Sequence, residues 1–402
     1  MSSRLLAGER LCREVQYTVR ATFALSLLLG LAACSTEPRN SLDNLTFHGA
    51  PYPQSRYITA VTWDFSAMVN QRKAHGSDLW PCTWAADGNL YCAWGDGGGF
   101  DGDSENFGRT SLGFARIEGM PTTAEPGGFA GKNVWGAAPE YAEHQATFGG
   151  KVESMISVNG TLYAYARLWT ERDTSDPVHR NEAGPLPTLI WSQDLGSHWQ
   201  IALWENTQLG SFLNFGQDNA GALDSFVYVY YKRLNDNSRV YLKRVPKTML
   251  TADPATSDAY EYLTGVNWRC RPKSWSKREG DARAIFSDPK GAEVEVVYDA
   301  PLRRFLLVAA HNPGGTEATA SAGQVGLFEA PHPWGPWATI GYYDNWGDLG
   351  PESHGDYLGV TLPTKWISKD GLTLWGIFSS LGQYDSFNIV KATLAVAPRA
   401  AR

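Results

Sequence analysis

Charged residues, cysteines and helical periodicity are all scarce in this sequence. Charged residues make up 19% of its 402 residues, and the net charge is −7. This mild acidic balance gives no reason to expect binding to nucleic acid or to anionic lipid. Apolar residues almost never recur at the spacing of an amphipathic helix, which argues against a helical fold. The 5 cysteines include no pair with the spacing of a zinc site, and we expect no metal ion or cofactor.

Aromatic residues and glycine are abundant instead. The chain has 16 Trp, 18 Tyr and 41 Gly, and 43% of its residues are hydrophobic. Aromatic side chains favour strands and the clefts that bind sugars, while glycine and proline mark turns. We therefore expect a β-rich domain with a substantial core.

Residues 1–33 have the features of an export signal. Arg13 and Arg20 precede an apolar run that is too short to span a bilayer and that ends in Leu-Ala-Ala-Cys at Cys34. This ending resembles the bacterial lipobox, which implies cleavage before Cys34 and lipidation of that cysteine. The alternative is an ordinary signal peptide with a chance cysteine. Residues 34–55 are polar and indicate a tether, so we expect an exported lipoprotein at the bacterial cell surface or in the periplasm.

A turn followed by an aromatic, β-branched strand recurs along the rest of the chain. The repeats are centred, 64 to 77 residues apart, on Gly88, Gly160, Asp224, Pro301 and Gly371. Periods of this size with several strands per unit are typical of propeller blades. Pairing residues 57–63 with residues 387–396 would close the ring and remove its exposed sheet edges.

The sequence therefore predicts an all-β fold. We expect one five-bladed β-propeller of four-stranded antiparallel blades over residues 56–397. The alternative is a two-domain β-sandwich, which the even spacing and the lack of a linker disfavour.

The densest stretch of the chain is a hairpin within residues 76–102. Two strand-like runs, residues 80–85 and 89–94, flank a three-residue turn that ends in Gly88. In this register Cys82 lies opposite Cys92, so the two are plausible disulfide partners in an oxidising compartment. The alternative is a pair of small buried core residues.

The same register places Asp78 opposite Asp96, at the open end of the hairpin. Two carboxyl groups beside tryptophans and a glycine run suggest a site. The alternative is that Asp78 caps a loop and Asp96 occupies a glycine-rich turn. Pro81 and Gly95 are residues that could break the ladder between the strands.

Several segments resemble a known bacterial family. They are residues 77–100 (SDLWPCTWAADGNLYCAWGDGGGF), 148–151 (FGGK), 328–337 (FEAPHPWGPW) and 362–375 (LPTKWISKDGLTLW). The family is domain-of-unknown-function family 4185, part of which is classed as glycoside hydrolase family 183, and the resemblance spans roughly residues 57–396. It implies a five-bladed propeller acting as an endo-D-arabinanase on mycobacterial arabinogalactan and lipoarabinomannan. It also implies a catalytic carboxylate pair, which matches Asp78 and Asp96 here.

Glycoside hydrolysis needs such a pair. One carboxyl group protonates the leaving oxygen, and the other acts as nucleophile or activates water. Two acids held close together cannot both ionise easily, so one is pushed toward the proton-donor state. The sequence leaves open which aspartate is the donor, the glycan linkage, the endo or exo mode, and the stereochemical outcome.

Substrate contacts are expected at the inner strand ends of the other blades, because polar residues and tryptophans gather there. Tryptophan faces suit sugar rings, and polar groups suit ring hydroxyls. The candidates are Trp80, Lys151, Asn214, Gln217, Asp218, His311, Asn312, His354 and Trp366. The alternative for each is a capped turn or an aromatic residue at the edge of the core.

The leading hypothesis is therefore a hydrolase of an arabinofuranose polymer. The expected partners are a polysaccharide substrate and a membrane, contacted only through the lipid anchor, and we expect a monomer. One alternative is a hydrolase of another glycan, such as an α-L-arabinan. Another is a propeller that binds glycan without cleaving it, although a pure binder has no need of paired acids.

Overall fold

The computed structural model describes residues 49–102, 108–122, 128–136, 140–169, 186–206, 208–234, 236–267, 269–291, 293–310, 324–344, 346–348, 359–380 and 384–398. Apart from one short α-helix, α2 (Ser66–Gln71), and several 3-10 turns, the described elements are strands. Among these residues, none of the helices has the length and apolar character needed to cross a membrane.

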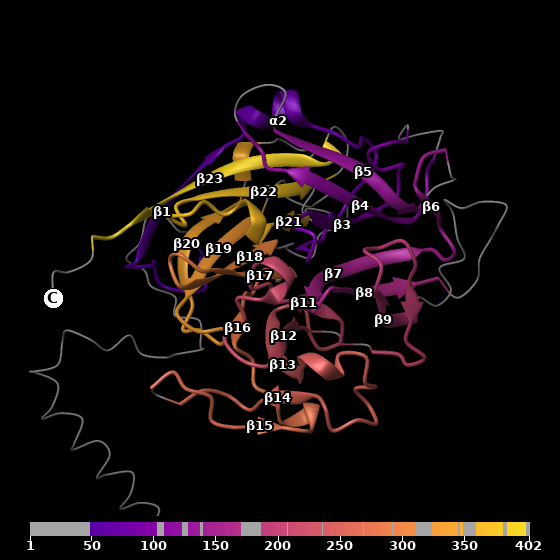
Figure 1. Ribbon diagram of the computed structural model, residues 1–402. Coiled ribbons are helices and arrows are strands. Elements are labelled where there is room, and N and C mark those ends of the chain that lie inside the picture. The colour runs from indigo at the N-terminus through magenta and orange to yellow at the C-terminus, as the bar shows by residue number, and fades with distance from the viewer. Residues whose placement is uncertain are drawn as a thin grey trace, which may run out of the picture.

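The strands form five antiparallel sheets arranged as the blades of a ring (Figure 1). Blade 1 comprises β2 (Cys82–Trp84), β3 (Leu90–Gly95), β4 (Leu112–Gly119), β5 (Phe129–Gly136) and the short parallel β6 (His144–Gln145). Blade 2 comprises β7 (Gly150–Val158), β8 (Thr161–Leu168), β9 (Leu186–Ser192) and β10 (Gln200–Ile201). Blade 3 comprises β11 (Gly210–Phe212), β12 (Phe226–Tyr231), β13 (Arg239–Pro246), β14 (Glu261–Leu263), β15 (Trp275–Ser276) and β16 (Phe286–Ser287).

Blades 4 and 5 complete the ring. Blade 4 comprises β17 (Glu293–Asp299), β18 (Arg304–Ala310), β19 (Val325–Ala330) and β20 (Ala338–Tyr343). Blade 5 comprises β21 (Gly359–Thr361), β22 (Thr373–Ser379), β23 (Asn388–Val396) and β1 (Ile58–Asp64). The predicted five-bladed all-β propeller is confirmed.

Each predicted repeat is the turn between the two innermost strands of one blade. The turns at Gly88, Gly160 and Gly371 have φ values of 87°, 78° and 74°. Glycine adopts this left-handed region without a Cβ penalty. The hairpins were visible in the sequence because each one joins a turn of this kind to a strand rich in aromatic and β-branched residues.

The first and last strands of the described chain close the ring. β1 pairs antiparallel with β23, from Ile58 opposite Val396 to Asp64 opposite Lys391. The predicted closure is therefore correct. The pairing leaves β1 as the outer strand of blade 5 and joins the two ends of the domain.

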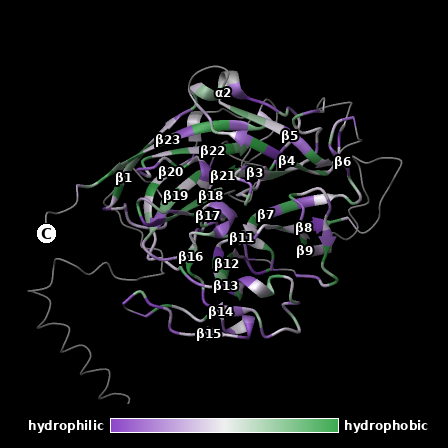
Figure 2. Ribbon diagram, in the orientation of Figure 1, coloured by the Kyte–Doolittle hydropathy of each residue, from purple (hydrophilic) through white to green (hydrophobic). Residues whose placement is uncertain are grey.

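The core lies between the blades rather than in one central mass. Five hydrophobic clusters are each shared by two neighbouring blades, so every blade buries both of its faces. Figure 2 shows hydrophobic residues along the strands and mostly hydrophilic ones around β14 and β15. The cluster between blades 1 and 5 includes Trp80, Trp94, Trp366 and Phe387.

Residues 50–55 belong to the domain, although the sequence placed them in the tether. Tyr52 is buried and packs on Phe286 and Phe328. Ser55 donates a hydrogen bond to the Glu329 carboxylate, and its backbone N–H donates to Thr339. A polar-looking segment is thus held by one buried ring and a few specific hydrogen bonds. Cys34 and the predicted signal sequence lie outside the described residues, so export and lipidation stay predictions.

Candidate functional site

The inner hairpin of blade 1 carries the predicted acid pair. Cys82 lies opposite Cys92 in the β2–β3 ladder, as the register predicted, and the two form a disulfide with their Cα atoms 4.1 Å apart. The ladder continues in this register to Pro81, whose carbonyl accepts a hydrogen bond from Ala93.

Beyond Pro81 the register changes by one residue. Asp78 pairs with Gly95, and not with Asp96 as a regular ladder would require. The cause lies at Leu79 and Trp80, which adopt left-handed φ values of 73° and 57°. Such an irregularity leaves extra chain on one strand and re-aims the neighbouring side chains. The predicted Asp78–Asp96 opposition was wrong by this one residue, although both aspartates remain at the same end of blade 1.

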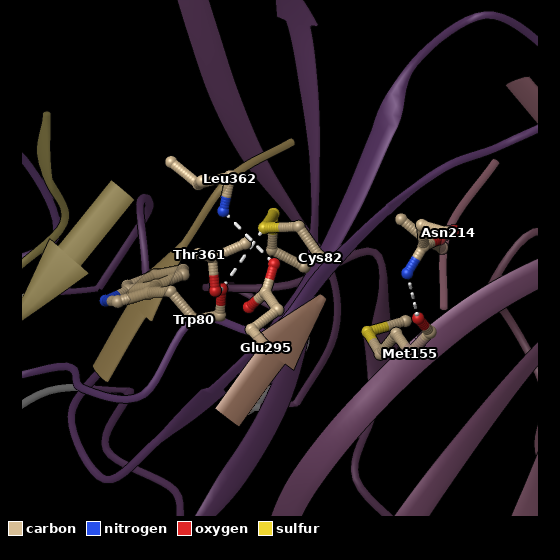
Figure 3. Close-up of a disulfide and its surroundings, with 9 residues drawn as sticks. Trp80, Cys82, Met155, Asn214, Glu295, Thr361 and Leu362 are labelled. Atoms are coloured by element: carbon tan, nitrogen blue, oxygen red, sulfur yellow. Dashed lines mark hydrogen bonds between the residues drawn. A yellow bond between two sulfur atoms is a disulfide. The ribbon is translucent and has the colours of Figure 1, made fainter. Parts of the chain in front are cut away.

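Blade 5 holds this strained turn in place. The Leu79 N–H donates to Ser379 Oγ at 2.9 Å, and Thr361 Oγ1 donates to the Trp80 carbonyl at 3.0 Å (Figure 3). Trp80 Nε1 donates to the Ser77 carbonyl at 3.0 Å. Non-glycine residues in this backbone region cost of order 1–3 kcal/mol each and persist only where the surroundings hold them. These three hydrogen bonds fix the direction in which Asp78 projects.

Asp78 is partly exposed as a residue, but its Oδ1 atom is buried and has no hydrogen-bond partner among the described residues. Burial raises the pKa of Asp78 to about 7, because the low-dielectric surroundings disfavour its charged form. The Lys151 cation opposes this shift, whereas the negative charges of Asp96 and Asp385 reinforce it. Asp78 is thus poised to carry a proton near neutral pH.

Asp96 has different surroundings. Its side chain is 37% exposed, and Lys151 Nζ lies 2.7 Å from its Oδ1 atom. Arg109 Nη2 lies 3.9 Å from the other oxygen. Although the Lys151 contact is close, Nζ makes no hydrogen bond among the described residues, so it is an ion pair without hydrogen-bond geometry. Asp96 is a cation-paired carboxylate that solvent can reach.

Two residues of this cluster escaped the sequence analysis. Arg109 follows a glycine-rich loop with no distinguishing pattern. Asp385 precedes β23, and its carbonyl accepts a hydrogen bond from the Gly76 N–H at 2.6 Å. Burial raises the pKa of the Asp385 carboxyl group, Asp96 raises it further, and Arg109 and Lys151 oppose the shift. The site therefore combines three carboxyl groups with two cations.

Two predicted substrate contacts, Trp80 and Trp366, have structural surroundings instead, and a third, Asn214, is held by hydrogen bonds between blades. Trp80 and Trp366 are both 0% exposed, and their rings pack in the cluster between blades 1 and 5, so no face is left for a sugar. Asn214 is 7% exposed and is among the residues that line the cavity along the ring. Its Oδ1 accepts from Thr83 at 2.9 Å and its Nδ2 donates to the Met155 carbonyl at 3.1 Å, which ties blade 3 to blades 1 and 2 (Figure 3).

Gln217 and Asp218 lie at the far end of the ring from the acids. Gln217 donates to the Ala86 carbonyl, in the turn of the blade 1 hairpin. The Asp218 carboxylate accepts from the Gly160 N–H, in the turn of blade 2. The sequence took both residues to precede the inner strand of blade 3. They follow it, because that strand is the three-residue β11.

Of the remaining candidates, Lys151 is the one that the structure brings to the acid cluster. It lies near the start of β7, opposite Arg167 on β8. His311, Asn312 and His354 lie outside the described residues, so their roles stay predictions.

A cavity of about 560 Å³ runs along the axis of the ring beside this cluster. Its wall includes residues from the inner strands of all five blades: Cys82, Val152, Ser211, Glu295 and Thr361. Leu79 and Lys151 also line it, which places the acid cluster at its edge. A cavity of this size is within the range of small-ligand sites.

No protein-family model matches the chain, and no curated protein matches it. Several solved structures are similar over most of its length. A protein from Bacteroides ovatus is 12% identical with a TM-score of 0.49, covering 83% of this chain and 90% of that one. A GH43_1 enzyme from Xanthomonas citri is 11% identical with a TM-score of 0.43, covering 83% and 95%. The α-L-arabinofuranosidase from Podospora anserina is 9% identical with a TM-score of 0.40, covering 81% and 92%.

Proposed function

We propose that the protein is a glycoside hydrolase in which Asp78 is the proton donor and Asp96 the second catalytic carboxylate. The observation that carries this proposal is the contrast between the two environments. Asp78 is partly exposed as a residue, but its Oδ1 atom is buried without a hydrogen-bond partner among the described residues, and desolvation raises its pKa to about 7. Asp96 is partly exposed and paired with Lys151. Two carboxyl groups with divergent surroundings are the arrangement that splits acid and base roles.

The reaction assigns one bond change to each group. Asp78 gives its proton to the glycosidic oxygen as the bond to the anomeric carbon breaks, and the leaving sugar departs as an alcohol. Asp96 supplies its electron pair to the anomeric carbon or takes a proton from the attacking water. Lys151 and Arg109 orient Asp96 and offset its charge. If Asp96 bonds to the anomeric carbon, a water molecule attacks that carbon in a second step, Asp78 takes a proton from this water, and the bond to Asp96 breaks. If Asp96 instead takes a proton from the attacking water, the water oxygen bonds to the anomeric carbon, Asp96 loses that proton to solvent, and Asp78 regains one from solvent.

For the substrate we propose an arabinofuranose polymer of the arabinogalactan or lipoarabinomannan type. Support comes from the resemblance to the endo-D-arabinanase family over the segments that contain Asp78 and Asp96. We also propose that the enzyme acts outside the cytoplasm, held through a lipid on Cys34.

The test is release of reducing ends from purified mycobacterial arabinogalactan. Wild type should release oligosaccharides, and Asp78→Asn and Asp96→Asn should each lower the rate by about 10²–10⁴-fold. Asp258→Asn replaces an exposed aspartate away from the cavity and should leave the rate unchanged. Release from a different glycan, lost in the same two variants, would keep the mechanism and change the substrate. Glycan binding with no release from any glycan, and unaffected by the two substitutions, would refute the hydrolase.

A further inference from the structure

The cavity wall has four cationic side chains among its described residues, and each already has an anionic partner. The pairs and their N–O distances are Lys151–Asp96 at 2.7 Å, Arg167–Glu153 at 2.5 Å, Lys232–Glu293 at 3.1 Å and Arg233–Glu279 at 2.6 Å. An anionic ligand would have to share one of these cations with a carboxylate that is already beside it. The positive charge of the described wall is therefore already neutralised.

Glu295 is an acidic residue of the cavity wall that has no cationic partner among the described residues. It lies on β17, the inner strand of blade 4, and lines the cavity. Its Oε1 atom accepts a hydrogen bond from the Leu362 N–H at 3.1 Å, and the Thr361 side chain also hydrogen-bonds its carboxyl group. No lysine, arginine or histidine of the described chain forms an ion pair with it. Protein atoms surround the carboxyl group, yet the residue keeps some exposed surface, and that surface faces the cavity.

We propose that this cavity binds an uncharged sugar unit, with Glu295 hydrogen-bonding to its hydroxyl groups, and that the site therefore selects neutral over acidic glycans. The inference rests on the proposed function and adds to it a residue that recognises the sugar and a class of glycans that the site rejects. A hydroxyl group both donates and accepts, so it can match a carboxyl group in either protonation state. Burial raises the pKa of Glu295 to about 7, so both states are accessible near neutral pH.

A ligand carboxylate or phosphate is disfavoured for two reasons. It would be buried without a free cation, and a buried unpaired charge is costly. It would also face the ionised form of Glu295, since like charges repel strongly in a low-dielectric site. Uronate-containing, sialylated and phosphorylated glycans should consequently be excluded.

The experiment measures binding by calorimetry in the Asp78→Asn background, which keeps the Lys151–Asp96 pair intact and blocks cleavage. The probes are a neutral arabinofuranosyl oligosaccharide, a neutral xylo-oligosaccharide and an oligogalacturonate of matched length. At least one neutral probe should bind at least about tenfold more tightly than the galacturonate. Adding Glu295→Leu should weaken neutral binding by about tenfold, whereas Glu295→Gln should keep most of it.

Glu293→Gln is the matched variant two residues away on the same strand. It leaves Glu295 untouched and frees Lys232, so galacturonate binding should improve, and any loss of neutral binding should be smaller than in Glu295→Leu. Equal affinity for the galacturonate, or neutral binding that survives Glu295→Leu in a protein with unchanged thermal stability, would overturn the proposal. If no glycan is cleaved but neutral binding still depends on Glu295, the role of Glu295 in sugar binding is supported and the proposed hydrolase activity is refuted. If cleavage proceeds with an unchanged KM in Glu295→Leu, the hydrolase activity is supported and the role of Glu295 in sugar binding is refuted.

Discussion

The backbone groups of Asp78 and Gly95 exchange two hydrogen bonds of 2.9 Å, which places the Asp78 carboxyl group over the α-carbon of Gly95. A Cβ atom on Gly95 would lie 2.5 Å from Asp78 Oδ1 and 2.8 Å from Lys151 Nζ. The missing side chain of one glycine thus leaves room for both the donor acid and its neighbouring cation.

Gly95→Ala should therefore abolish most of the activity. The methyl group would push apart Asp78 and Lys151, and misplacing catalytic groups by about 1 Å can cost about 10²-fold in rate. Gly280→Ala is the control, because nothing lies within 4 Å of its added Cβ. We expect similar thermal midpoints for both variants and a loss of kcat/KM in Gly95→Ala alone. Full activity in Gly95→Ala would show that the carboxyl group does not need this position.

The activity should fall as the pH rises through about 7, because Asp78 must be protonated and its pKa is raised to about 7. Lys151→Gln removes a cation that lowers this pKa, so the loss of activity at alkaline pH should begin at a higher pH. Asp385→Asn removes a negative charge that raises the pKa of Asp78, so the loss of activity should begin at a lower pH. The measurement is the pH dependence of kcat/KM. If the pH profiles of both variants shift in the same direction, the alkaline loss of activity does not report the ionisation of Asp78.

The disulfide should contribute to stability. Cys82 and Cys92 are both buried and are separated by 10 residues. Loop-closure entropy for a loop of this length predicts a loss of about 2–3 kcal/mol in the free energy of unfolding for the Cys82→Ala/Cys92→Ala double variant. Chemical denaturation measures this value, and reductant should lower the stability of wild type but not of the variant. Cys270→Ala removes the free cysteine of the described part of the chain and should cost much less.

Ring closure depends on the apolar face of β1. Ile58 is 0% exposed and lies in the cluster between blades 4 and 5. Ile58→Ala should lower the free energy of unfolding by about 2–5 kcal/mol, because it leaves a cavity at the seam of the ring. Thr59→Ala alters the exposed neighbour and removes one hydrogen bond, so it should cost less than about 1.5 kcal/mol. Equal small losses of unfolding free energy in both variants would mean that the pairing of β1 with β23 does not depend on the packing of Ile58.

Local patterns predicted the hairpins, the ring and the Cys82–Cys92 register, because turn chemistry and strand composition are properties of neighbouring residues. The one-residue change at Asp78 could not be predicted in the same way. It depends on left-handed backbone at Leu79 and Trp80, residue types that rarely adopt it, and on hydrogen bonds from Ser379 and Thr361 far along the chain.

Composition also misled the search for substrate contacts. Tryptophan suits both a sugar platform and a blade interface, and the burial of Trp80 and Trp366 is visible only in three dimensions. The inner strands β11 and β21 have three residues each, which is too short for a clear alternating pattern. Gln217 and Asp218 were consequently placed at the opposite end of blade 3 from where they lie.

The hold of blade 5 on the Leu79–Trp80 turn has a consequence for biosynthesis. Leu79 and its partner Ser379 are 300 residues apart, and Trp80 and Thr361 are 281 apart. Because a chain is synthesised from its N-terminus, Asp78 emerges from the ribosome long before the residues that fix its direction. A nascent or truncated chain would carry every residue of the first blade and still lack an ordered proton donor. The acid cluster becomes complete only when the last blade has folded against the first. Catalysis by Asp78 therefore depends on residues of blade 5 that are synthesised much later.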